Sequence, residues 1–141
     1  MQNLKTAGIA VLVALTVLGV GYLWGARGRW AAEERLQGVE RQAAFNEARR
    51  LTLAGQMSLT RLNFGEAAGL FESARVAAEE IARGLDQDGQ IELAGEATRA
   101  AQALAEARAL AAKLDQGAAG KGGEALAILD AAAAKTPGPG R

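Results

Sequence analysis

The sequence RLNFGEAAGLFESAR, from Arg61 to Arg75, connects two apolar patterns near the middle of the chain. Apolar residues at helical spacing precede Asn63 and resume directly after Glu66, which predicts two consecutive helices joined by a tight connection. Asn63 can end the first helix in a left-handed turn or cap the second, and Gly65 loosens the connection. Glu66 complements the positive end of the second helix. The stretch therefore indicates the corner of a helical hairpin and not a catalytic loop.

Both helices of this hairpin show one apolar stripe. The segment from Trp30 to Leu62 contains no proline, and its predicted stripe consists of Leu36, Val39, Ala44, Ala48, Leu51, Gly55, Ser58 and Leu62. The stripe predicted for the following helix consists of Ala67, Leu70, Phe71, Ala74, Ala78 and Ile81. Steps of three and four place each set on one side of a helix, where it can pack against the other.

The hairpin resembles a tetratricopeptide repeat over roughly residues 51–84. That pattern has a large apolar residue, an apolar residue followed by glycine, a turn, and Ala-x-x-x-Phe. The chain matches it with Leu51, Ala54 and Gly55, then Ala67 and Phe71, and Ala74 follows one turn later. Ser58 departs from the pattern, which usually has tyrosine there. The resemblance implies close helix packing at Leu51, Gly55, Ala67, Phe71 and Ala74, and a protein-binding function.

The second half of the chain predicts two further helices. After a turn at residues 86–90, apolar residues alternate at steps of four and three, which is typical of a helix–helix seam. This seam consists of Leu93, Ala97, Ala100, Leu104, Ala107, Ala111 and Leu114. Residues 117–123 are rich in glycine and are expected to form a loose connection, followed by a last helix over residues 124–135.

An uncharged segment near the amino terminus predicts a membrane span. Twenty-one residues from Thr6 to Ala26 carry no charge, and a helix needs roughly 20 apolar residues to cross a bilayer. Aromatic and basic residues gather at its second boundary, where they suit the membrane interface: Tyr22, Trp24, Trp30, Arg27 and Arg29. A cleaved signal peptide and a buried core helix are the alternatives, but the bulky, basic exit is a poor cleavage site.

The basic residues around this span bear on its orientation. Lys5 precedes it, whereas Arg27, Arg29, Arg35 and Arg41 follow it. The positive-inside bias favours a single-pass protein of the inner or plasma membrane with its helical part in the cytoplasm. A periplasmic location stays open, because a very short amino-terminal tail with one lysine also begins many periplasm-facing proteins.

Composition weighs against several classes of function. Sixteen basic and sixteen acidic residues cancel, so no overall field favours nucleic acid. The chain has no histidine and no cysteine, and no nucleophile–base pair is found in it. We expect no enzyme activity, no metal, no cofactor and no small-molecule substrate.

The sequence thus predicts an all-α protein in three parts. Residues 1–29 form the transmembrane anchor, residues 30–136 a helical-hairpin domain of about four antiparallel helices, and residues 137–141 a disordered tail. Because alanine buries little area, the core is expected to need another protein or a second copy of the chain. Three functions remain: a membrane-anchored adaptor or scaffold, an accessory subunit of a membrane complex, and a self-oligomerising coiled-coil envelope protein.

Overall fold

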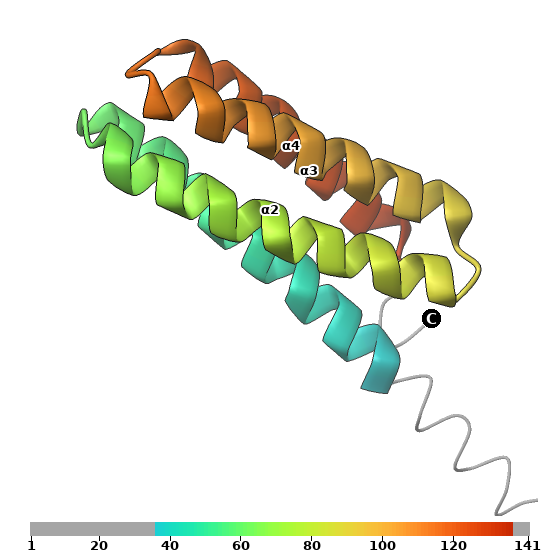
Figure 1. Cartoon of the computed structure of the whole chain (residues 1–141). Coiled ribbons are helices and arrows are strands. Elements are labelled where there is room, and N and C mark those ends of the chain that lie inside the picture. Colours follow the sequence, from blue (N-terminus) through green and yellow to red (C-terminus); the bar gives the residue numbers. More distant parts are fainter. Residues whose placement is uncertain (1–35, 137–141) are drawn as a thin grey trace, which may run out of the picture. The chain divides into compact units, whose positions relative to one another are not determined.

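The computed structural model describes residues 36–136, which are helical throughout apart from three short corners (Figure 1). Residues 36–60 are helical. They are followed by α2 (Phe64–Gln87), α3 (Ile91–Ala112) and α4 (Gly117–Lys135). No strand occurs between residues 36 and 136. The predicted all-α class with four helices is therefore confirmed for this part of the chain.

The chain divides into two units, and the helices belong almost entirely to the second. The first unit is Met1–Gln37 and the second is Gly38–Arg141. Within the described part of the second unit, α3 packs against both α2 and α4. The first helix lies beside α2, where Arg41 of the first helix binds Asp88 just after α2.

The first helix also lies beside α4, and this contact closes the bundle. Arg49 of the first helix forms an ion pair with Asp130 of α4. Figure 1 shows α2 and α3 nearer the viewer, with the first helix and α4 behind them. Since consecutive helices run in opposite directions, the arrangement is an up-down-up-down four-helix bundle.

All three corners share one way of ending a helix. A backbone N–H two residues past the helix cap donates to the carbonyl five positions earlier, at 2.8–3.0 Å: Asn63 to Ser58, Gln90 to Leu85 and Asp115 to Leu110. The residue before each of these donors has a positive φ: Leu62 (58°), Gly89 (73°) and Leu114 (60°). This is the Schellman ending, in which glycine is usual because it adopts a positive φ without strain. Two of the three corners use leucine instead.

The first corner differs in detail from the sequence-based expectation. Leu62, and not Asn63, adopts the left-handed conformation. Asn63 caps α2, as predicted: its Oδ1 accepts a hydrogen bond from the Glu66 N–H at 3.3 Å, and its Nδ2 donates to the Glu66 carboxylate at 2.8 Å. Gly65 lies inside the first turn of α2 and does not loosen the corner.

The glycine-rich stretch at residues 117–123 is helical, so the prediction of a loose connection is wrong. α4 begins at Gly117, whose N–H donates to the Asp115 carboxylate at 2.8 Å. Glycine is a poor helix former, but Gly122 is buried against the ring of Phe71 from α2. Close packing therefore overrides local propensity here.

No helix between residues 36 and 136 combines the length and apolar character that a membrane crossing requires. The predicted span, from Thr6 to Ala26, lies outside the described residues.

Candidate functional site

The most tightly packed point of the bundle is the ring of Phe71 on α2. Phe71 is fully buried. A Cβ atom on Gly55 of the first helix would lie 2.8 Å from its Cε1, and one on Gly122 of α4 would lie 3.0 Å from the same atom. Both distances are shorter than normal carbon–carbon contacts of about 3.5–4.0 Å. The ring of Phe71 therefore joins three helices, and two of them approach it only because they carry glycine.

The other predicted hairpin residues lie around this point. Ala67 and Ala74 of α2 are fully buried, and Leu51 of the first helix is partly buried against the core. The structure thus brings together all five residues that the tetratricopeptide resemblance singled out.

The predicted seam on α3 faces the inside of the bundle. Five of its members are fully buried: Ala97, Ala100, Leu104, Ala107 and Ala111. Leu93 is partly buried. Because α2 and α4 both pack on α3, a second chain could reach this seam only if the bundle opened. The partner of the seam is the rest of the same chain.

Leu114 does not belong to this seam, and its assignment there is corrected. It follows the end of α3, adopts a φ of 60° and is 69% exposed. The heptad spacing extends to Leu114 in the sequence, but the helix ends before it and the chain turns away from the core.

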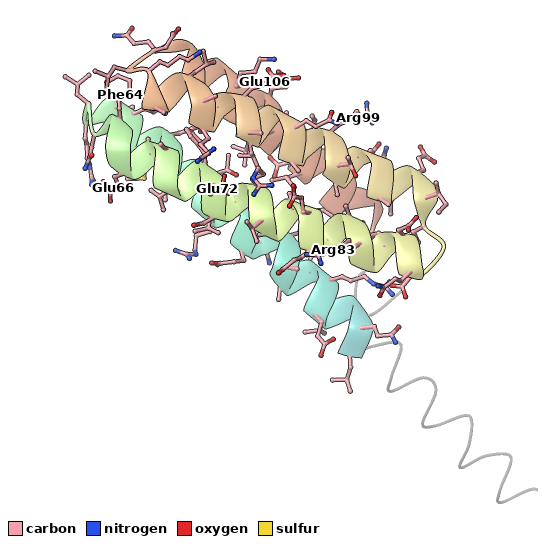
Figure 2. The ribbon with its side chains drawn as sticks, viewed as in Figure 1. Phe64, Glu66, Glu72, Arg83, Arg99 and Glu106 are labelled. Atoms are coloured by element: carbon pink, nitrogen blue, oxygen red, sulfur yellow. The ribbon has the colours of Figure 1, made fainter. Side chains whose placement is uncertain are left out.

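Ion pairs join neighbouring helices at the surface. Arg108 of α3 lies 3.2 Å from the Glu72 carboxylate of α2, and Lys121 of α4 lies 2.8 Å from Glu106 of α3. Figure 2 shows Glu72 on α2 and Glu106 on α3 among the surface side chains. A hydrogen bond from Arg75, with further attraction from Arg75 and Arg108, lowers the pKa of Glu72. Exposed pairs of this kind stabilise a fold only weakly.

One ion pair is different because its carboxylate is buried. Glu96 of α3 is 9% exposed, and its Oε1 accepts a hydrogen bond at 2.6 Å from the Lys135 ammonium group at the end of α4. This bond raises the pKa of Lys135. The other oxygen, Oε2, has no hydrogen-bond partner among the described residues. The Arg99 guanidinium lies farther away, 3.9 Å from the same Oε1, so Lys135 is the closer of two cationic neighbours on which this buried carboxylate depends.

Two further kinds of site were considered in the sequence: a metal site and the membrane interface. Within residues 36–136, no three acidic side chains gather as a metal site would require. The predicted membrane-interface residues lie outside the described residues: Tyr22, Trp24, Arg27, Arg29 and Trp30.

Three features escaped the sequence analysis. Gly122 was assigned to a loop, although a glycine at a helical step from apolar residues could have marked a close approach. Nothing in the sequence singled out the pair of Glu96 and Lys135, because 39 residues separate them. The predicted stripe of the first helix also includes three residues that are 62%, 49% and 71% exposed: Leu36, Val39 and Leu62.

These observations define a four-helix bundle whose organised features are helix interfaces and ion pairs. No family model, curated protein or solved structure matches the chain. The tetratricopeptide resemblance therefore stays a prediction. A repeat array stacks hairpins so that each contacts only its neighbours, whereas here the first helix also contacts the last.

Proposed function

We propose that the chain is a non-catalytic, membrane-anchored helical scaffold that mediates protein–protein interaction. The observation that carries this proposal is the uncharged segment from Thr6 to Ala26, which precedes a bundle beginning near Gly38. A span of this length followed by a closed helical unit has the organisation of a single-pass anchor with a folded head.

The chemistry of the bundle supports a scaffold and not a catalyst. The core consists mainly of alanine, leucine and phenylalanine, and many surface charges form ion pairs within and between helices. Those pairs include Arg41 with Asp88, Arg108 with Glu72 and Lys121 with Glu106. These pairs contribute little to stability, and with the charges paired, the exposed apolar residues are the features available for recognition.

Membrane fractionation tests the anchor directly. The full-length chain is expected in the membrane pellet after extraction with alkaline carbonate or high salt, because a hydrophobic span resists both. Deletion of residues 5–26 is expected to release a helical, soluble chain. If carbonate or high salt extracts the full-length chain, the anchor is refuted.

A second candidate is an accessory subunit of a membrane complex, which the small-residue step between Gly21 and Gly25 favours, since such spacing lets two membrane helices approach closely. Purification in mild detergent separates the two candidates. A subunit is expected to co-purify with other membrane proteins at fixed stoichiometry, whereas a scaffold is expected to release its partners when diluted.

The side of the membrane needs a separate test. The chain contains no cysteine, so a single cysteine at an exposed position such as Ala127 can be labelled without background. The proposed cytoplasmic head predicts labelling by a membrane-impermeant maleimide only after the membrane is opened. Labelling in intact cells would place the head on the periplasmic side.

A further inference from the structure

The first helix carries a second row of residues on the side that faces away from the bundle. All members of this row are exposed: Val39, Ala43, Asn46, Arg50, Leu53 and Met57. The exposed fractions of Val39, Leu53 and Met57 are 49%, 45% and 56%. We call this row the outer stripe. Its members follow steps of four, three, four, three and four.

The outer stripe lies opposite the core. At 100° per residue, Val39 and Met57 point about 120–140° away from Phe45 and Thr52, which are fully buried. Alternating steps of three and four are the spacing of a coiled-coil seam. The first helix thus has two packing faces, and the bundle uses one of them.

The outer stripe does not suit a lipid surface. Its centre is polar, with Asn46 and Arg50, and the exposed carboxylates of Glu40 and Glu47 flank one side. A helix that lies on a membrane has a continuous apolar face with basic flanks. A coiled-coil seam, by contrast, commonly includes one polar position that fixes the register.

The spacing matches itself when the helix is reversed. If a second copy runs antiparallel with its centre at residue 48, Val39 faces Met57 of the other copy and Ala43 faces Leu53. Asn46 then faces Arg50, and each relation occurs twice, as an isologous contact requires. We propose that the outer stripe is a self-association surface on which two copies of the chain pair antiparallel through their first helices.

Charge selects this direction over the parallel one. Arg50 binds the Glu47 carboxylate through two hydrogen bonds, at 2.6 and 2.7 Å. A parallel pair would place Arg50 opposite the same residue of the other copy, and like charges at an interface disfavour association. The antiparallel pair places the guanidinium opposite the amide oxygen of Asn46. This oxygen accepts a hydrogen bond from Arg49 of its own chain at 3.4 Å, and its second lone pair can accept one from Arg50 of the other copy.

The expected dimer is weak. Six paired positions on one helix cover less than the roughly 800 Å² per partner of a standard stable interface. Tethering to a membrane would raise the effective concentration of the chains and favour pairing. In an antiparallel pair, Val39 of one copy lies about 27 Å from Val39 of the other along the helix axis, at 1.5 Å per residue. Residues 27–35, which precede the helix, can span at most about 32 Å, so both proposed anchors could enter one bilayer.

Cross-linking of the full-length chain in mild detergent tests the pairing and its direction. The chain lacks cysteine, so single cysteines can be introduced without background. Ala43→Cys and Leu53→Cys carry tags of different size, and the two variants are mixed and oxidised. The antiparallel pair predicts mainly mixed cross-links between the two versions. Equal or greater cross-linking within each version would overturn the proposed direction. Cross-linking no better than for Ala109→Cys, an exposed control on α3, would overturn the surface.

A charge substitution gives an independent measurement. Leu53→Glu with Met57→Glu is expected to weaken dimerisation at least about tenfold, because charge is then buried in an apolar contact. Leu114→Glu is the matched control, because Leu114 is also exposed but lies at a corner. Sedimentation should show loss of dimer only for the first variant. No effect, or an equal effect of the control, would contradict the proposal. If the chain were monomeric before the double substitution, and the double variant were released from membranes, the stripe would be a lipid contact and the proposal would be wrong.

These outcomes are distinct from those of the proposed function. A chain that pairs through the outer stripe but is extracted by carbonate would refute the anchor alone. A chain that resists carbonate but shows no cross-link would refute the pairing alone.

Discussion

Gly55 and Phe71 are so close that the fold leaves no space for a side chain on the glycine. A Cβ atom on Gly55 would lie 2.8, 3.0 and 3.2 Å from three atoms of the Phe71 ring. The first helix and α2 can therefore meet at this distance only with glycine at position 55. The same ring contacts Gly122 of α4, so one aromatic side chain determines the spacing of three helices.

Replacement of Gly55 by alanine is expected to destabilise the bundle. Alanine is the better helix former by about 1 kcal/mol, but overpacking of a filled core costs about 1–3 kcal/mol. The net loss in the free energy of unfolding should be up to about 2 kcal/mol. Gly69→Ala is the control, because no atom lies within 4 Å of a Cβ there. It should stabilise α2 by about 0.5–1 kcal/mol. Urea unfolding followed by circular dichroism measures both, and a gain from Gly55→Ala would contradict the packing described.

Leu62 and Leu114 have a positive φ, so replacement of either leucine by glycine is expected to stabilise the bundle. The left-handed conformation costs an L-residue about 1–2 kcal/mol. Glycine avoids this cost, but part of the gain is lost because glycine makes the unfolded chain more flexible. Leu62→Gly and Leu114→Gly should each stabilise the bundle by about 0.5–1 kcal/mol. Gly89→Leu, at the third corner with a φ of 73°, should destabilise it. Thermal melts test all three, and destabilisation by both glycine substitutions would show that the leucine side chains contribute more than their backbone strain costs.

The pair of Glu96 and Lys135 should matter more than its neighbours at the surface. Lys135→Met leaves the buried Glu96 carboxylate with only the more distant Arg99, at 3.9 Å, which is expected to lower the free energy of unfolding clearly. Lys121→Met removes a similar ion pair, but Glu106 and Glu124 have side chains more than half exposed, so the loss of stability should be much smaller. Equal costs in urea unfolding would mean that Glu96 is solvated in solution.

The lowered pKa of Glu72 predicts how acid affects stability. The pKa is depressed below its ordinary value of 4.5 mainly by the hydrogen bond from Arg75. The stabilisation is therefore present above pH 4.5 and is lost as the pH falls through the lowered pKa. Glu72→Gln should make the loss of stability below pH 4.5 shallower. Glu80→Gln, on the same helix, is the control. Melts at several pH values test this, and identical profiles for both variants would contradict it.

The sequence predicted the elements of the fold better than their arrangement. The corner at Asn63 and the buried alanines of α2 and α3 follow from spacing and capping, which are local properties. The start of α4 at Gly117 does not, because its helical state depends on packing against Phe71, 46 positions earlier in the chain. The exposure of Val39 was missed for a similar reason, since the first helix has apolar residues on two faces. Spacing alone does not say which face the rest of the chain covers.

If one chain closes its own core around Phe71, substitutions at Phe71 and at the two glycines against it must have coupled effects on stability, and double-mutant cycles measure this coupling. Each glycine substitution, Gly55→Ala or Gly122→Ala, is made alone and together with Phe71→Leu in the chain that lacks residues 5–26. The free energy of unfolding of every variant is measured with urea. With Phe71 present, both glycine substitutions should destabilise the bundle. With the shorter leucine, their penalties should largely vanish, giving a coupling of about 1–3 kcal/mol. Strictly additive effects would show that the ring of Phe71 does not lie against both glycines and would contradict the closed bundle.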